Sequence, residues 1–141
     1  MVSSWEIFQE RIKNEMRKKF SKTVIEHSSD PRNIGNIDDA NGYARVTGPS
    51  DETMEIWLKV DGDTIVKAGF SSTGCGITIA SGSVITEMVK GKNTNDALAI
   101  GQQDVLDALG GLPDDNKHCA LLASNTLKAA IIDYIQKKNH H

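Results

Sequence analysis

The sequence has little of what marks several common classes of protein. It contains two cysteines in 141 residues, too few for a framework of disulfides. No apolar run approaches the roughly 20 residues of a transmembrane helix, and the first 20 residues are charged and amphipathic, unlike a signal peptide. Sixteen lysines and arginines against 19 aspartates and glutamates give a net charge of −3, which disfavours binding to nucleic acid. We therefore expect a cytoplasmic protein that binds neither nucleic acid nor membrane.

The composition that remains is typical of one globular domain. Hydrophobic residues make up 38% of the chain and charged residues 25%, values that suit a packed core. His140 and His141 fit the remnant of a purification tag, so residues 139–141 are treated as a tail. In a reducing cytosol, Cys75 and Cys119 are expected to be free thiols or metal ligands.

An amphipathic helix is predicted at the start of the chain. Ser3 and Glu6 fit a capping box, and the residue before Pro31 marks the latest plausible end of the helix. We regard residues 1–19 as an additional helix and expect its apolar stripe to pack on the body of its own domain. His27, near the end of the helix, is expected to be a structural cation at the helix dipole. The stripe consists of Trp5, Phe8, Ile12, Met16 and Phe20.

A small antiparallel sheet is predicted in the middle of the chain. Apolar and polar residues alternate over residues 54–60, and the turn at 61–63 leads into a second β-rich run at 64–70. Residues 43–47 are a candidate third strand. Helical periodicity follows over residues 77–89, 95–100, 103–109 and after 117. Strands first and helices later predict an α+β fold, in which about three antiparallel strands are packed by helices.

Both cysteines are predicted at the starts of helices. Cys75 lies between two glycines where a strand passes into a helix, and a helix N-terminus favours the ionised thiol. Cys119 has the same setting beside His118, directly after a polar loop. Two thiols and an imidazole suit a soft metal ion. Spacing alone leaves open the alternative that the cysteines are small buried residues and the histidine is solvated.

Three segments of the chain resemble the IscU/NifU family of iron-sulfur cluster assembly scaffolds. Residues 73–92 are similar to its signature segment, residues 24–35 to its opening segment, and residues 118–119 with 127–134 to its closing segment. The resemblance covers roughly residues 20–138 and implies a divergent member with an IscU/NifU-like fold of the SufE/NifU type. Such scaffolds are not enzymes. They hold a transient 2Fe-2S cluster, or a single zinc or iron ion, on three cysteines and a neighbouring aspartate or histidine, and they accept sulfur from a cysteine desulfurase.

The family's ligands transfer to this chain position by position. Cys75 matches the second family cysteine and Cys119 the third, while His118 matches the histidine before the third. Aligned on the methionine that follows, Ser50 stands at the position of the first cysteine and Glu52 at that of the aspartate.

The serine changes what the resemblance implies. A serine hydroxyl stays protonated near neutral pH, whereas iron-sulfur clusters are held by thiolates. A mononuclear site should therefore survive better than a cluster site. Two alternatives stay open, namely that Ser50 was introduced by engineering and that a second subunit of a homo-oligomer supplies a ligand. The expected ligands of a single zinc or ferrous ion are Cys75, His118, Cys119 and Glu52.

The expected partner is a cysteine desulfurase. Residues 112–116 read Leu-Pro-Asp-Asp-Asn, whereas scaffolds that use a dedicated Hsp70-type chaperone carry Leu-Pro-Pro-Val-Lys there. The acidic replacement opposes the same docking, so we expect no such chaperone; these residues also suit capping of the next helix. Two other functions remain: a metal-free interaction paralogue that retains the fold and partner binding, and a zinc-dependent hydrolase with Glu52 as base.

Overall fold

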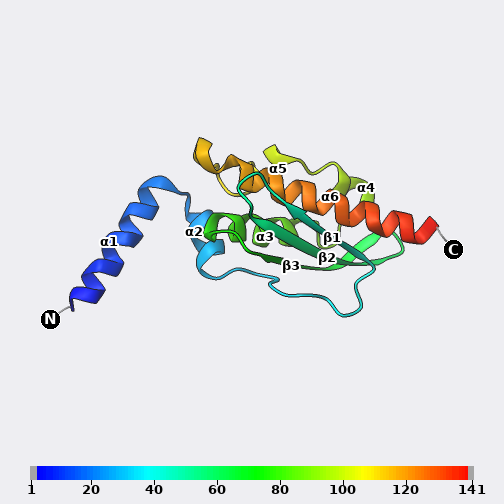
Figure 1. The fold of residues 1–141 in the computed structure, drawn as a ribbon, viewed down its shortest axis with the longest axis horizontal. Coiled ribbons are helices and arrows are strands. Elements are labelled where there is room, and N and C mark those ends of the chain that lie inside the picture. The colour runs from blue at the N-terminus through cyan, green and yellow to red at the C-terminus, as the bar shows by residue number, and fades with distance from the viewer. Residues whose placement is uncertain (1–2, 140–141) are drawn as a thin grey trace.

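A computed structural model describes residues 3–139 of the chain. His140 and His141, the expected tag remnant, lie outside the described residues. Figure 1 shows a small sheet flanked by helices, with one further helix projecting from the body. The elements in chain order are α1 (Ser4–Lys19), α2 (Lys22–Ser29), β1 (Gly42–Thr47), β2 (Thr53–Asp61), β3 (Thr64–Ser72), α3 (Gly76–Val89), α4 (Thr94–Leu98), α5 (Gln102–Ala108), the 3₁₀ helix η1 (Asp114–Asn116) and α6 (Lys117–Asn139).

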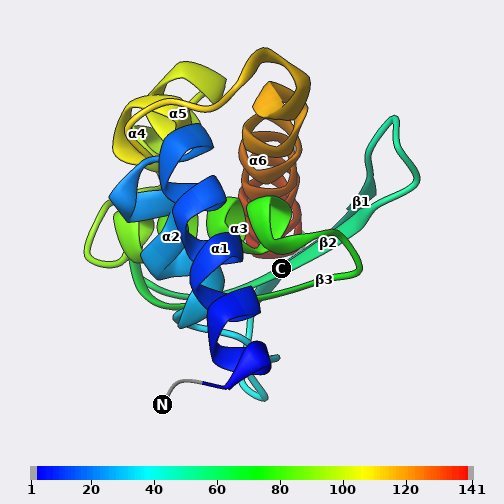
Figure 2. The same cartoon turned by 90° about the vertical axis from the view of Figure 1, so that its left-hand side faces the viewer.

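The three strands form one antiparallel sheet in the order β1-β2-β3. Gly62 supplies the positive φ, 65°, that the tight turn between β2 and β3 requires. Alternate residues of β2 are buried, and α3 and α6 pack against the sheet, as Figure 2 shows from the side. The predicted α+β fold with a three-stranded antiparallel sheet is thus confirmed. The buried apolar positions of β2 are Met54, Ile56, Leu58 and Val60.

The core lies between the sheet and helices α3 and α6. Ile85 and Val89 of α3 and Leu127 and Ile131 of α6 are fully buried. The face of α6 that meets the sheet carries mostly small or apolar residues, so the helix lies close to β1 and β2. No helix within residues 3–139 is both long enough and apolar enough to cross a lipid bilayer.

The opening segment forms two helices instead of one. Ser21 stands between them and caps α2, because its hydroxyl accepts a hydrogen bond from the Val24 N–H at 3.1 Å. The same hydroxyl donates to the carbonyl of Leu109, which ties this break to the end of α5. Serine is a poor residue for the interior of a helix but a good N-cap, because its hydroxyl accepts a hydrogen bond from the first free N–H groups. This preference explains the break between α1 and α2, which the hydrophobic periodicity did not indicate.

The prediction that α1 packs on the body of its own domain is wrong. Figure 1 shows α1 extending away from the sheet and the other helices. Trp5 and Phe8 stack on each other with ring centroids 5.8 Å apart, but their exposed fractions are 64% and 52%. Of the predicted stripe, Phe20 packs against the core, and the side chain of Met16 lies outside the described part of the structure.

His27 joins α2 to α3. Its Nδ1 lies 2.6 Å from the hydroxyl of Ser83, so the imidazole contacts the neighbouring helix and not the carbonyls at the end of its own. Burial, with the nearby Arg32 guanidinium, lowers the pKa of His27. His27 is therefore structural, as expected, but it acts by bonding to α3, and its lowered pKa favours the neutral imidazole over a cation at the helix dipole.

Because α1 buries little against the rest of the chain, we propose that residues 1–19 are dispensable for folding. A chain that begins at Phe20 is expected to keep its free energy of unfolding within about 0.5 kcal/mol of the full chain, measured by urea denaturation. Ile131→Ala, a control in the core, should lower it by about 2–5 kcal/mol. A loss of comparable size on removal of residues 1–19 would contradict the proposal.

Candidate metal centre

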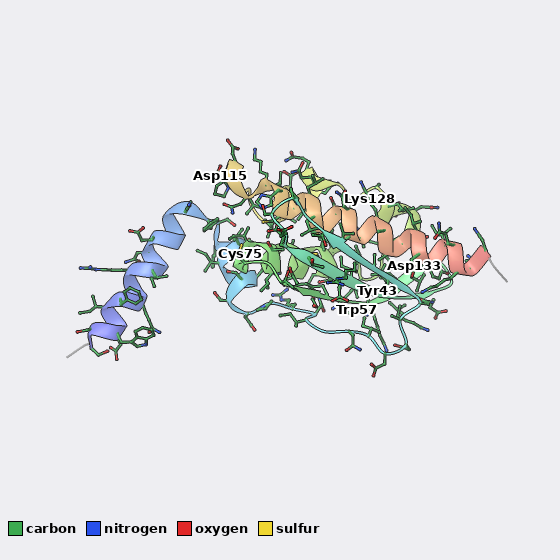
Figure 3. The ribbon with its side chains drawn as sticks, in the orientation of Figure 1. Tyr43, Trp57, Cys75, Asp115, Lys128 and Asp133 are labelled. Atoms are coloured by element: carbon green, nitrogen blue, oxygen red, sulfur yellow. The ribbon has the colours of Figure 1, made fainter. Side chains whose placement is uncertain are left out.

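Three chain segments that are far apart in sequence meet beyond one end of the sheet. The turn between β1 and β2 is fixed to the junction of β3 and α3 by two hydrogen bonds: the Thr53 N–H donates to Thr73 Oγ1 at 2.9 Å, and the Thr73 N–H donates to the Thr53 carbonyl at 3.0 Å. Figure 3 shows Cys75 at the end of α3 that lies next to α2, with Asp115 at the same end of the molecule, just before α6. The first turn of α6 therefore faces the same region.

Glu52, His118 and Cys119 bring three ligand atoms of different kinds together. One carboxylate oxygen, one ring nitrogen and the thiol sulfur all lie within 4.8 Å of one another. His118 Nε2 is 3.1 Å from Glu52 Oε1 and 3.7 Å from Cys119 Sγ. In a tetrahedral zinc site, ligand atoms are separated by about 3.4–3.8 Å, given metal–ligand bonds of about 2.0–2.3 Å. The three atoms are thus already near the spacing that a single ion requires.

The hydrogen-bonding capacity of Glu52 Oε1 is not satisfied. The atom is buried and accepts no hydrogen bond within the described residues; its neighbour His118 Nε2, at 3.1 Å, forms an ion pair with it when the imidazole is protonated. A buried carboxylate oxygen without a partner is costly. The turn that carries Glu52 includes Asp51 at φ 63°, a left-handed conformation that aspartate tolerates better than most residues. Backbone geometry and burial together hold this oxygen towards the imidazole and the thiol.

Cys75 is the exposed and more acidic thiol of the pair. It is the N-cap residue of α3. Burial opposes its ionisation, but the N–H groups of Thr78 and Ile77 at the start of the helix stabilise the thiolate and lower the pKa of Cys75 below its usual value. The expectation from the sequence is met here. Cys75 Sγ lies 3.9 Å from Thr78 Oγ1 and is not one of the three clustered ligand atoms.

Cys119 does not share the setting of Cys75, and the expectation that it ionises readily is wrong. Its side chain is buried, and burial raises the pKa of the Cys119 thiol, with further contributions from the charges of Cys75 and Glu52. The start of a helix is therefore not sufficient to make a thiol acidic when the surrounding residues exclude water.

Ser50 lies in the exposed part of the turn between β1 and β2, two residues before Glu52. Among the described residues, the metal-type cluster takes its carboxylate from this turn and no thiol. Nearby, Asp114–Asn116 form a 3₁₀ turn that runs directly into α6, and Asp114 pairs with Lys117 at 3.0 Å. This turn positions His118 by backbone geometry, without the side-chain cap expected from the sequence.

Thr78 is a member of the site that sequence reasoning missed. Its hydroxyl donates a hydrogen bond to Cys119 Sγ at 3.3 Å and lies 3.9 Å from Cys75 Sγ. The signal was present in the sequence, because a residue three positions after a helix N-cap faces the cap residue. Only the packing of α3 against α6 shows that the same hydroxyl also reaches the second thiol.

The fold and this cluster define a class: a small α+β domain that gathers sulfur, nitrogen and carboxylate ligands beyond one end of a three-stranded sheet. The family described as "NifU-like N terminal domain" matches residues 19–141. The iron-sulfur cluster assembly scaffold protein IscU 1 of Archaeoglobus fulgidus is 42% identical over 119 residues, which cover 84% of this chain and 78% of that protein. The IscU scaffold of Escherichia coli is 41% identical over 124 residues, 84% of this chain and 96% of its own. The chain belongs to the NifU-like N-terminal domain family.

Solved structures share the fold at lower identity. A NifU-like protein (N-terminal) of Brucella abortus is 18% identical with a TM-score of 0.70, over 83% of this chain and 94% of its own. A protein described as a SUF-system assembly scaffold of Fervidobacterium islandicum is 22% identical with a TM-score of 0.64, over 79% and 96%. These two likenesses bear on the fold alone, and they agree with the α+β architecture described above.

The opposite pKa shifts of the two thiols predict a difference in reactivity. With iodoacetamide near neutral pH, Cys75 should be alkylated faster than Cys119 by on the order of tenfold or more, because it is exposed and more ionised. The rate for Cys75 should rise with pH around a midpoint below that of a free thiol, and the rate for Cys119 around a higher midpoint. Mass spectrometry of peptides from timed samples measures both, and preferential labelling of Cys119 would contradict the prediction.

Proposed function

We propose that this chain is an iron-sulfur cluster assembly scaffold that binds a single iron or zinc ion through Glu52, His118 and Cys119, while Cys75 stays outside this ligand set as the thiol that reacts with a partner. The observation that carries the proposal is the cluster of three ligand atoms around the buried Glu52 Oε1, which accepts no hydrogen bond and is held 3.1 Å from a ring nitrogen and within reach of a thiol. A cation bonded to this oxygen would remove the energetic cost of its isolation. The family relatives named as IscU scaffolds support the same direction.

The donor set fits iron or zinc by its chemistry. Sulfur and imidazole ligands favour zinc and ferrous iron, and a carboxylate is compatible with both. A bound cation would also stabilise the thiolate of Cys119, whose burial otherwise favours the protonated thiol. The same carboxylate is the base that a hydrolase would need, so placing Glu52 among the ligands leaves that alternative without its base. The chain is accordingly proposed to be a carrier and not an enzyme.

Cys75 is the proposed acceptor of sulfur from a cysteine desulfurase. It is exposed, and its thiolate is stabilised at the start of α3, which are the properties of a thiol that reacts with an external partner. The thiolate attacks the outer sulfur of a persulfide on the donor enzyme. One sulfur–sulfur bond forms at Cys75, the bond in the donor breaks, and its electron pair leaves with the donor's cysteine thiolate.

The charge of the segment before α6 bears on whether a chaperone is a further partner. Asp114 and Asp115 are exposed at the tip before α6, so this segment presents negative charge to a partner. A dedicated Hsp70-type chaperone that docks on an apolar and cationic peptide would be repelled there. A 2Fe-2S cluster is proposed to be held only transiently, since the chain offers two thiolates and not three.

Metal binding is the first test. Protein purified without a histidine tag is expected to bind about one zinc ion per chain, and Cys119→Ala and His118→Ala should each weaken the affinity by on the order of 100-fold or more, because each removes a ligand. Glu52→Gln, which keeps the shape and removes the charge, should weaken it by about 10–100-fold. Competition with a chromophoric chelator measures these affinities, and elemental analysis checks the stoichiometry.

The matched control is Asp115→Asn, a carboxylate on the same side of the molecule but outside the cluster, which should leave the affinity unchanged. Equal affinities for the wild-type protein and all ligand variants would contradict the proposed site. In that case, retained binding of a desulfurase by Cys75→Ala and Cys119→Ala would favour the metal-free paralogue.

Ser50→Cys is expected to lengthen the lifetime of a cluster. A third thiolate in the turn beside Glu52 would replace a hydroxyl that binds iron poorly. After anaerobic reconstitution with ferrous iron, sulfide and a desulfurase, the sulfur-to-iron charge-transfer absorption should decay more slowly in Ser50→Cys than in the wild type. Ser50→Ala is the control and should decay like the wild type, and equal lifetimes for all three proteins would show that residue 50 does not reach the cluster.

A further inference from the structure

Thr78 occupies an unusual position for a buried threonine. It is the third residue of α3 and is fully buried. Its hydroxyl lies between the two thiols, 3.3 Å from Cys119 Sγ, to which it donates, and 3.9 Å from Cys75 Sγ. The side chain packs against the backbone of Gly74, where an added Cβ would come within 2.6 Å of the Thr78 side chain. Thr78 is thus held between the two sulfurs and has little space to turn away.

Other buried hydroxyls of the long helices bond to nitrogen or carbonyl groups; Ser83, for example, contacts the His27 ring and accepts from the Arg32 N–H. Ser81 donates to the Ile77 carbonyl at 2.9 Å, and Thr126 donates to the Leu122 carbonyl at 2.7 Å, each one helical turn earlier. Thr78 is too close to the start of α3 to have a helical carbonyl four residues before it. Its hydroxyl instead faces sulfur atoms, which are weak acceptors while they carry a proton.

We propose that Thr78 is a positioning residue of the metal centre, whose hydroxyl holds Cys119 Sγ in place as a metal ligand. The inference rests on the proposed function. The 3.3 Å hydrogen bond from Thr78 and the packing of its side chain against Gly74 fix the position of the sulfur. A ligand whose orientation is already fixed loses less freedom when an ion binds, so this contact favours binding.

The same hydroxyl separates the tasks of the two cysteines. It donates its single proton to Cys119, the buried sulfur that belongs to the ligand cluster. Cys75, on the other side of Thr78, takes its stabilisation from the N–H groups at the start of α3. A hydroxyl can donate only one hydrogen bond, so holding Cys119 leaves Cys75 exposed and free to react with a partner.

The test compares Thr78→Val with Thr78→Ser and with Thr126→Val. Thr78→Val keeps the branched shape and removes the hydroxyl, so the zinc affinity should fall by about 10–100-fold, while urea denaturation of the metal-free protein should show little change. Thr78→Ser should retain most of the affinity. Thr126→Val makes the same chemical change at another buried position and should leave the affinity unaltered.

Cobalt(II) gives a second readout that a purely structural role would not change. A hydrogen bond stabilises the lone pairs of a sulfur ligand, so its removal should shift the sulfur-to-cobalt charge-transfer band of Thr78→Val to longer wavelength relative to the wild type and Thr78→Ser.

The outcomes separate this inference from the proposed function. Zinc binding by the wild type that depends on Cys119 but is equal in Thr78→Val would overturn the inference and leave the proposed function standing. Absence of zinc binding by the wild type would overturn both. If Thr78→Val unfolds without metal while Thr126→Val does not, the hydroxyl determines the fold and the inference fails.

Discussion

The reciprocal hydrogen bonds between Thr53 and Thr73 are the constraint on which the site depends. They extend the pairing of β2 and β3 by one step beyond Met54 and Ser72, and they fix the turn before β2 to the chain that enters α3. The turn itself is closed by the Gly48 N–H, which donates to the Glu52 carbonyl at 2.7 Å, so Glu52 is held on a tight turn. Its carboxylate faces the first turn of α6, which is placed independently by the packing of that helix on the sheet. The ligand cluster is therefore a consequence of sheet register and not of a local sequence motif.

Burial then gives the gathered groups different chemistry. The same end of the molecule contains an acidic thiol and a weakly acidic one. Burial raises the pKa of both, but Cys75 is stabilised as a thiolate by backbone N–H groups at the start of α3, whereas Cys119 is buried without such N–H donors. The negative charge of Glu52 disfavours ionisation of both thiols. A cation placed among these groups would be attracted by the carboxylate and would reverse its effect on Cys119. The Glu52 oxygen that accepts no hydrogen bond and the weakly acidic Cys119 thiol are therefore better explained as two ligands of one site than as two unrelated features.

Much of the fold could be predicted from the sequence, because the patterns involved are local. Alternation over 54–60 and the turn at Gly62 determine a hairpin, and the helical stripe after Gly76 determines α3. The break at Ser21 was missed because the apolar spacing continues through it, and only the partners of its hydroxyl show that a new helix begins. The position of α1 depends on whether the body offers a matching surface, which no property of the helix itself reveals. In the site, the identities of Glu52, His118 and Cys119 followed from family resemblance, whereas the burial of Cys119 depends on contacts between α3 and α6.

Ser50, which the family resemblance aligns with a cysteine, can be explained by this arrangement. A cluster needs several equivalent thiolates, but here the turn supplies a hydroxyl, and the remaining thiols differ in exposure and acidity. Equivalent ligands suit a cluster that must be held evenly, whereas unequal ligands suit successive steps: a buried sulfur, fixed by the Thr78 hydroxyl, retains an ion, and an exposed sulfur exchanges with a partner. The difference between the two thiols fits the function proposed above, in which one cysteine retains the metal and the other accepts sulfur. The inequality follows from the environments of the two thiols, so restoring a third cysteine at residue 50 would add a ligand without making Cys75 and Cys119 alike.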